Sequence, residues 1–188
     1  AMPMPPPPDF ATLSLSEIAQ ALADRRLPPV ESWTPARCGD SDMRIARDGR
    51  WFHAGTPIER EAMVRLFSTL LRREADGSHV LVTPHEKLDI AVEDAPFVAV
   101  EMKEEGDGAD ANLAFRLNTG ELVRAGPDHR LRIGGDAAAP RPYLHVRAGL
   151  EALVARAVFY ELADRAVVAA DGTAGVWSDG AFFALEPA

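Results

Sequence analysis

Between residues 79 and 146 the chain is divided into short segments that are too brief for stable helices. LDIAVE (88–93), FVAVEMKE (97–104) and NLAFRLN (112–118) are rich in β-branched or alternating apolar residues, a composition typical of strands. Prolines and glycines separate these segments, as turns require. The pattern predicts about seven strands, too many for one small flat sheet, and therefore a strongly curled sheet or partial barrel.

Two longer segments outside this region carry apolar residues at helical spacing. The first, residues 58–74, follows Thr56 and Pro57, which are typical of a helix N-cap and a first helical residue. The apolar face of this predicted helix consists of Met63, Leu66, Phe67 and Leu70. A second helix is predicted over residues 147–165, with a stripe of Leu150, Leu153, Val154, Ala157 and Val158. A third is predicted over residues 14–26, where Ser14 and Glu17 have the spacing of a capping box.

The apolar positions of the two long predicted helices superpose at a constant offset of 87 residues. Because an amphipathic helix offers few other spacings, chance agreement remains an open alternative to duplication. The first helix is preceded by Asp48-Gly49, which predicts a tight hairpin turn. Three strands are predicted after the second helix, over residues 166–170, 174–178 and 181–185.

These patterns together predict an α+β fold built on a repeated helix-plus-antiparallel-sheet motif. Its C-terminal part is expected to be a curled sheet with one long helix. Residues 1–8 are proline-rich and predict a disordered lead-in. We expect an N-terminal sub-domain over residues 9–76, with a helix, a hairpin and a second helix, and a C-terminal sub-domain over residues 77–188.

Charge is distributed unevenly along a chain whose formal net charge is −9. Residues 25–73 hold ten arginines against six acidic residues, whereas residues 85–110 hold two lysines against nine acidic residues. The overall balance disfavours nucleic-acid binding, which depends on neutralising phosphates. No apolar run approaches the roughly 20 residues of a membrane-spanning helix. The single Cys38 excludes an intrachain disulfide, so we expect a soluble, cytoplasmic protein.

No catalytic or metal-binding pattern is complete in this sequence. Asp40 and Asp42 begin a spacing found in calcium loops, but Arg44 and Ile45 stand where an oxygen ligand and a glycine are needed. The five histidines include no i, i+4 pair of the kind that binds zinc on a helix. We therefore predict no metal site, no cofactor and no catalytic residue.

Arginines near the starts of the two long predicted helices suggest a binding cleft. If the helices pack around a common cleft, Arg60 and Arg147 would line it, and Arg156 would lie on the second helix. Trp51 or Trp177 would supply an apolar contact, and we include Glu86 and Asp94 among the cleft residues. The expected partner is a small anionic ligand or an acidic protein segment. Internal ion pairing of the same arginines is the open alternative.

Two further functions remain open from the sequence. Glu86 and Asp94, with His85, could form the paired acids of a small hydrolytic enzyme, because carboxylates held close together separate in pKa. The arginine-rich residues 25–73 could instead support weak nucleic-acid binding. The hydrolase requires the two carboxylates to share a pocket.

Five stretches of this chain carry a recognisable combination of motifs. They are CGxxDMRIxRDGRWFHxGTPIxR (38–60), LVTPxEK (81–87), VEDAPFVAVEM (92–102), PYLHVRAGLEALVARAVFYEL (142–162) and WSDGAFF (177–183). Together they resemble a bacterial family known as domain of unknown function 1285, over roughly residues 33–185. The charged positions that match are Asp42, Arg44, Arg60, Glu86, Glu93, Asp94, Arg147, Glu151 and Arg156.

The resemblance implies an α+β fold with a repeated motif and a C-terminal part that superficially resembles a pleckstrin-homology sheet and helix. For function it implies ligand binding at the junction of the two parts and a role in signalling.

Overall fold

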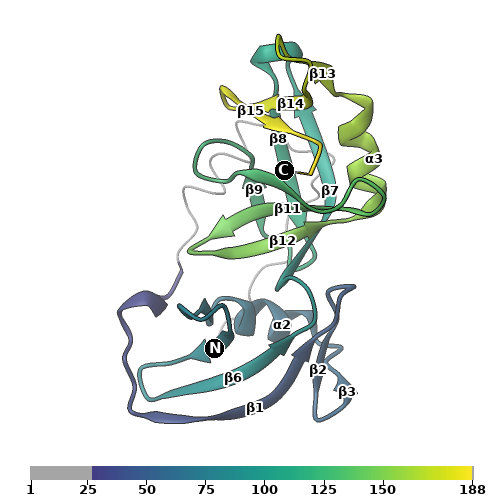
Figure 1. Cartoon of the computed structure of the whole chain (residues 1–188). Coiled ribbons are helices and arrows are strands. Elements are labelled where there is room, and N and C mark those ends of the chain that lie inside the picture. The colour runs from purple at the N-terminus through teal and green to yellow at the C-terminus, as the bar shows by residue number, and fades with distance from the viewer. Residues whose placement is uncertain (1–26, 188) are drawn as a thin grey trace.

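The computed structural model describes residues 27–187 and shows a mainly β protein with two short α-helices in that range. Figure 1 shows two layered parts, one above the other, with most of the strands in two six-stranded sheets. The predicted proline-rich lead-in over residues 1–8 and the predicted helix over residues 14–26 lie outside the described residues.

The first sheet forms the lower part in Figure 1, and its strands run in the order β3-β2-β1-β6-β5-β4. These strands are β1 (Arg37–Ile45), β2 (Trp51–His53), β3 (Thr56–Pro57), β4 (Leu71–Arg73), β5 (His79–Val82) and β6 (Glu86–Val92). The hairpin predicted at Asp48-Gly49 is confirmed: β1 and β2 pair antiparallel, and Gly49 has a φ of 92°. The predicted sub-domain boundary at residue 76 falls within this sheet, between β4 and β5.

The second sheet forms the centre of the upper part, with the order β10-β11-β12-β7-β8-β9. These strands are β7 (Phe97–Glu105), β8 (Asn112–Leu117), β9 (Leu122–Arg124), β10 (Leu131–Gly135), β11 (Pro140–Arg147) and β12 (Leu150–Val154). Each sheet contains one parallel pair, β1 with β6 and β12 with β7. A simple antiparallel meander therefore does not describe either sheet.

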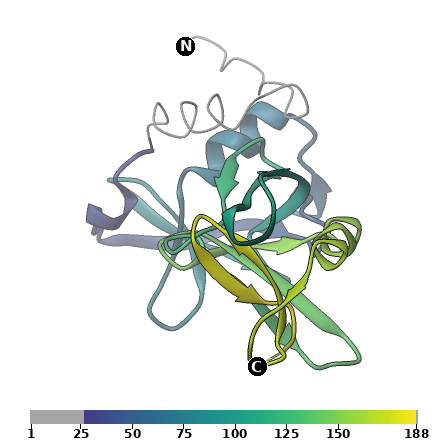
Figure 2. The same cartoon turned by 90° about the horizontal axis from the view of Figure 1, so that it is seen from above.

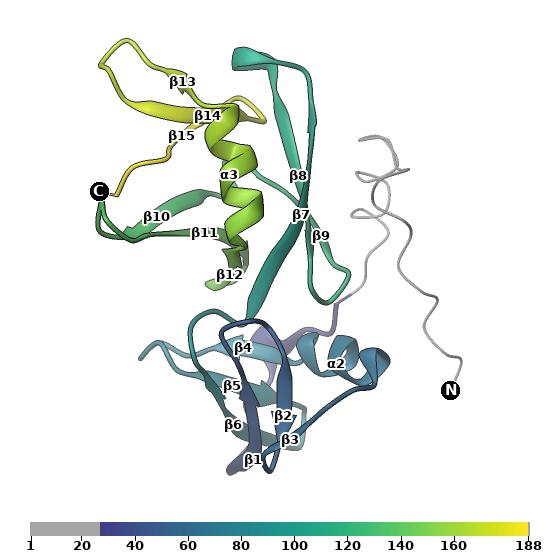
Figure 3. The same ribbon diagram turned by 90° about the vertical axis from the view of Figure 1, so that its right-hand side faces the viewer.

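A third sheet has three strands in the order β13-β14-β15. Its strands are β13 (Val167–Val168), β14 (Ala174–Ser178) and β15 (Ala181–Ala184), as the sequence predicted. Figure 3 shows this sheet at the top of the molecule and helix α3 (Arg156–Asp164) below it within the upper part, whereas helix α2 (Glu61–Ser68) lies at the junction of the two parts. Residues 27–187 also contain two short 3-10 helices, η2 (Val30–Ser32) and η3 (Gly108–Asp110).

The prediction of a long second helix over residues 147–165 is wrong for the first half of that range, which forms a turn and a strand. Ala148 and Gly149 both have positive φ, so the chain turns after β11 and returns as strand β12. Along β12, Leu150, Ala152 and Val154 are buried while the residues between them are half-buried, which is the two-residue period of a strand. The spacing of the apolar residues fits both the period of a helix and the period of a strand. Residues 150–154 form a strand because they pair with β11 and β7.

The predicted α+β class with a repeated helix-plus-antiparallel-sheet motif is therefore wrong, because this is a mainly β fold with three sheets. The proposed repeat matched residues 63–70 to residues 150–157, but the second set begins in strand β12. The expected pleckstrin-homology-like sheet with one long helix is also not found, because α3 has only nine residues. The first helix is also shorter than expected, and its predicted last residues form β4.

One continuous hydrophobic core joins the two parts. Ile45, Trp51 and Leu71 of the first sheet belong to the same buried cluster as Phe97 and Leu150 of the second. Figure 2 shows the molecule from above, so that the two parts overlap in this view. Within residues 27–187, no helix is both long enough and apolar enough to span a bilayer.

Candidate functional site

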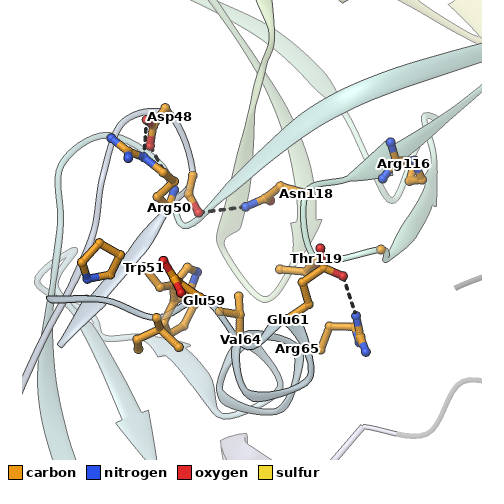
Figure 4. Close-up of a pocket in the computed structure, with 14 residues that line it drawn as sticks. Asp48, Arg50, Trp51, Glu59, Glu61, Val64, Arg65, Arg116, Asn118 and Thr119 are labelled. Carbon is orange, nitrogen blue, oxygen red and sulfur yellow. Dashed lines mark hydrogen bonds and ion pairs between the residues drawn. The ribbon is translucent and has the colours of Figure 1, made fainter. Parts of the chain in front are cut away.

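A cavity of about 560 Å³ lies at the junction of the two parts (Figure 4). Its walls come from the β1–β2 turn, strand β2, the segment before α2, helix α2, strand β8 and the β8–β9 turn. Ligand sites in proteins commonly have volumes of about 300–1,000 Å³. The lining residues are Asp48, Gly49, Arg50, Trp51, Pro57, Ile58, Glu59, Glu61, Val64, Arg65, Arg116, Asn118, Thr119 and Gly120.

One wall of the cavity depends on contact between two turns from different parts of the chain. Asn118 Nδ2 donates to the carbonyl oxygen of Gly49 at 3.0 Å, and the Val98 amide donates to Asn118 Oδ1 at 2.9 Å. A Cβ at Gly49 would lie 2.7 Å from Asn118 Nδ2, so the close approach requires glycine as well as its positive φ. The Asp48-Gly49 turn thus connects the two parts in addition to closing a hairpin.

The apolar wall consists of Trp51 and its neighbours. Trp51 is 1% exposed, and its ring stacks on Phe67 of α2 with the centroids 6.5 Å apart. Val64, one helical turn before Phe67, lines the cavity together with Pro57 and Ile58. The apolar lining of the cavity therefore comes from β2, β3, the residue after β3 and helix α2.

Three polar atoms in the walls are buried and make no hydrogen bond with any described part of the chain: Trp51 Nε1, Arg65 Nε and Thr119 Oγ1. They come from strand β2, helix α2 and the β8–β9 turn. A buried polar group without a partner costs about 1–3 kcal/mol, so native proteins rarely retain one without a reason. The three residues line the cavity, but these three atoms are themselves buried against the protein.

The charges around the cavity are balanced, with acids at Asp48, Glu59 and Glu61 against Arg50, Arg65 and Arg116. Asp48 pairs with Arg50 at 2.8 Å, and hydrogen bonds from Arg50 hold the pKa of Asp48 below its ordinary value. Arg116 pairs with Glu101 outside the cavity. Arg65 has a loose partner, since Glu61 lies 3.7 Å away with a side chain that is 87% exposed. The Arg65 side chain is itself only 16% exposed.

The structure separates the arginines that the sequence placed in one cleft. Arg60 occupies the N-cap position of α2 and is exposed, beside two residues that line the cavity. Arg147 ends strand β11, and its Nη2 donates to the Ser68 carbonyl at the other end of α2. The two arginines therefore lie at opposite ends of an eight-residue helix, about 12 Å apart along its axis. Arg147 also pairs with Glu121 and lies over the Phe97 ring.

The remaining predicted site residues lie in different places. Trp51 lines the cavity, whereas Arg156 begins α3 as an exposed residue with no ion pair among the described residues. Glu86 begins β6 and lies 4.0 Å from Arg37. Asp94 follows the other end of β6, roughly 20 Å away along an extended strand. Proton transfer between Glu86 and Asp94 therefore has no geometric support.

Asp94 belongs to a second, smaller cavity of about 130 Å³ on the same domain junction. Its side chain is 6% exposed, and it accepts a hydrogen bond of 2.6 Å from the Tyr143 hydroxyl. Burial and this bond to Asp94 raise the pKa of Tyr143 above its ordinary value. Arg132 forms a two-point ion pair with Glu151 at 2.7 and 2.8 Å. Within residues 27–187, no cluster of three or more histidine, cysteine or acidic side chains is placed to bind a metal.

His79 of the second cavity predicts a pH-dependent stability. Burial, and then the charge of Arg73, lower the pKa of His79 below its ordinary value of 6.5. As the pH falls below 6.5, His79 takes up a proton in the unfolded chain before it does so in the folded protein. The contribution of neutral His79 to the free energy of unfolding is therefore complete above pH 6.5 and is lost as the pH falls. Urea unfolding between pH 8 and pH 5 should show a smaller loss of stability in His79→Gln than in the wild type. Equal losses in both proteins would contradict the prediction.

Comparison with protein families identifies the chain. Residues 28–95 match the N-terminal domain of DUF1285, a domain of unknown function, and residues 96–185 match the C-terminal domain of the same family. This chain belongs to the DUF1285 family. The resemblance inferred from the motifs is thereby confirmed, and the division between the two DUF1285 domains coincides with the junction that holds both cavities. A search of the curated proteins gave no match.

Two solved DUF1285 structures resemble this one. A protein from Silicibacter pomeroyi DSS-3 is 48% identical, covers 93% of this chain and 95% of its own, and superposes with a TM-score of 0.81. A protein from Shewanella baltica OS155 is 25% identical, covers 65% of this chain and 91% of its own, and has a TM-score of 0.52. Both are described as DUF1285 family proteins, so they support the fold and the family.

Sequence reasoning missed two residues with unpartnered atoms, Arg65 and Thr119. Arg65 stands four residues after Glu61, a spacing that predicts an ordinary surface ion pair. Thr119 lies in Asn118-Thr119-Gly120, which predicts a hairpin turn and is confirmed as the β8–β9 turn. Neither local pattern contains a signal that these side chains meet Trp51 across a domain junction.

Proposed function

We propose that this DUF1285 protein is a non-catalytic binding module whose small-molecule ligand occupies the junction cavity. The observation that carries the proposal is a cavity of about 560 Å³ whose lining residues come from both domains. A ligand bound there would contact β2 and α2 on one side and the β8–β9 turn on the other. Binding would therefore stabilise the arrangement of the two domains, which is how a regulatory module could report its ligand.

The contacts elsewhere favour binding over the two alternative functions. The hydrolase alternative has its carboxylates at opposite ends of β6. The nucleic-acid alternative depends on the arginines of residues 25–73. Of these, Arg44, Arg72 and Arg73 already pair with Glu93, Glu74 and Glu151. Such pairs reduce the charge available for phosphate contacts.

Replacing Thr119 with valine tests the proposal through two opposite effects. Without ligand, the variant should gain up to about 1 kcal/mol in free energy of unfolding, because it removes a buried hydroxyl that has no partner. A ligand that contacts the hydroxyl should bind the variant about tenfold more weakly, a loss of one hydrogen bond. A fragment screen by thermal unfolding, followed by calorimetry of the strongest fragments, measures both effects.

Thr34→Val is the matched control, because Thr34 is exposed and lies outside the cavity. It should change neither stability nor fragment binding. Fragments that stabilise the wild type and Thr119→Val equally would show that they bind elsewhere. A clear loss of stability in ligand-free Thr119→Val would show that the hydroxyl serves the fold, against the proposal.

A further inference from the structure

Helix α2 has a second apolar side that stays exposed in the described part of the chain. Val64 and Phe67 pack against the hydrophobic core, as expected for an amphipathic helix. Ala62, Met63 and Leu66 share another side of the helix, and all three are exposed, Leu66 by 58%. Large apolar side chains gathered on one exposed surface commonly mark a place where another element packs.

The described chain begins beside the C-terminal end of this helix. Leu27 lines an apolar cavity of about 180 Å³ together with Thr69, the C-cap residue of α2. Arg72 fixes this start of the chain, because its Nη1 donates to the carbonyl oxygens of Val30 and Trp33 at 2.9 and 2.7 Å. The segment that precedes Leu27 therefore joins the described part of the molecule where α2 ends.

We propose that residues 14–26 form a helix that packs along the exposed apolar side of α2. The sequence of this segment begins with a capping box, and Leu15, Ile18 and Leu22 form one apolar stripe at helical spacing. A helix of about 13 residues is marginal in water unless its apolar side packs against a partner. The exposed side of α2 is an apolar surface within reach of this stripe.

The length of the segment fits this position. At about 1.5 Å per residue, residues 14–26 span about 20 Å as a helix, more than the roughly 12 Å of α2. Because its last residue adjoins Leu27, the segment runs parallel to α2 and the two helices end at the same place. Its apolar stripe then follows Met63 and Leu66, which are separated by about one helical turn, as are the members of the stripe.

The charges of the segment support the same direction. Glu17 precedes the end of the segment by the same number of residues that separate Arg60 from Thr69, so both lie about 14 Å from the shared end. Arg60 is exposed and has no ion pair in the described part of the chain, so it is free to pair with Glu17. At the other end, Arg25 and Arg26 adjoin the negative end of the α2 dipole.

Thiol reactivity at position 66 tests this packing in the full-length chain. Leu66→Cys is made in a Cys38→Ser background, so that the new thiol is the only one. Its reaction with dithiobis(nitrobenzoate) should be about tenfold slower than that of the exposed Cys38 in the wild type. Adding Ile18→Asp and Leu22→Asp should remove this protection, because carboxylates are costly to bury against the apolar side of α2.

The matched control adds the same two charges to the opposite side of the segment, as Ser16→Asp with Gln20→Asp. This control should leave the protection of Leu66→Cys unchanged. A thiol at position 66 that reacts as fast as Cys38 would overturn the proposal. Protection that survives the two substitutions in the apolar stripe would also overturn it. Protection that disappears on dilution would do the same, because it would identify a second copy of the chain as the occupant.

Hydrogen exchange gives a second measurement that needs no added cysteine. The α2 amides should exchange about tenfold faster in Ile18→Asp with Leu22→Asp than in the wild type, and at the wild-type rate in Ser16→Asp with Gln20→Asp. Equal exchange in all three proteins would contradict the packing. None of these outcomes depends on a ligand, so the proposed cavity binding is decided separately by the fragment screen.

Discussion

Replacing Arg147 with methionine is expected to lower the free energy of unfolding by about 3–5 kcal/mol, the cost of breaking a buried ion pair. The Arg147 side chain is 19% exposed and pairs with Glu121, whose side chain is 7% exposed. The same guanidinium donates to the Ser68 carbonyl at 3.0 Å and lies 5.3 Å from the Phe97 ring centre. One side chain thus connects strand β11 to the end of helix α2 across the domain junction.

Urea unfolding of the variant measures this loss, and two further variants identify its cause. Arg37→Met removes an arginine whose side chain is 82% exposed and should change stability by less than about 0.5 kcal/mol. The double variant Arg147→Met with Glu121→Leu should recover part of the loss, because it also removes the buried carboxylate. A loss below about 1 kcal/mol for Arg147→Met would mean that the pair behaves as a surface pair.

Replacing Ser178 with alanine is expected to cost about 1–3 kcal/mol for each of the two backbone groups that lose their partner. Ser178 is fully buried at the end of β14. Its Oγ accepts from the Leu113 amide at 2.8 Å and donates to the Ala125 carbonyl at 2.7 Å. Leu113 and Ala125 are both fully buried, so water cannot replace the hydroxyl without entering the core.

Thermal and urea unfolding of Ser178→Ala should both show the loss, with the third sheet detaching from β8 and β9 first. Hydrogen exchange can follow this order, because amides of the third sheet would exchange faster than those of the first sheet. Ser32→Ala is the control, since the Ser32 hydroxyl bonds to Pro29 in an exposed turn. A Ser178→Ala protein as stable as the Ser32→Ala control would contradict the assigned role.

Much of the strand pattern could be predicted from the sequence, but the first and last residues of the two helices could not. Glycine and asparagine turns, such as Asp48-Gly49 and Asn118-Thr119-Gly120, predicted hairpins that the structure confirms. Residues 150–154 suit a helical face equally well, and only their neighbours β11 and β7 show that they form a strand. This error produced the false repeat and, with it, the incorrect fold class.

The candidate site divides in a similar way between prediction and structure. Trp51 or Trp177 was predicted to supply an apolar contact in a cleft, and Trp51 lines the junction cavity. Its role in binding stays a prediction. Arg60 and Arg147 were grouped because each stood near the start of a predicted helix. Arg147 instead ends strand β11, so the reason for grouping them was the mistaken helix boundary.

Local features of this protein follow from its sequence because they depend on a few neighbouring residues. A glycine at positive φ or an alternation of apolar residues has the same meaning in any fold. The parallel pairing of β1 with β6 and of β12 with β7 depends on contacts between residues far apart in the chain. The meeting of Trp51, Arg65 and Thr119 around one cavity has the same origin, since packing of the two domains brings these residues to the same junction.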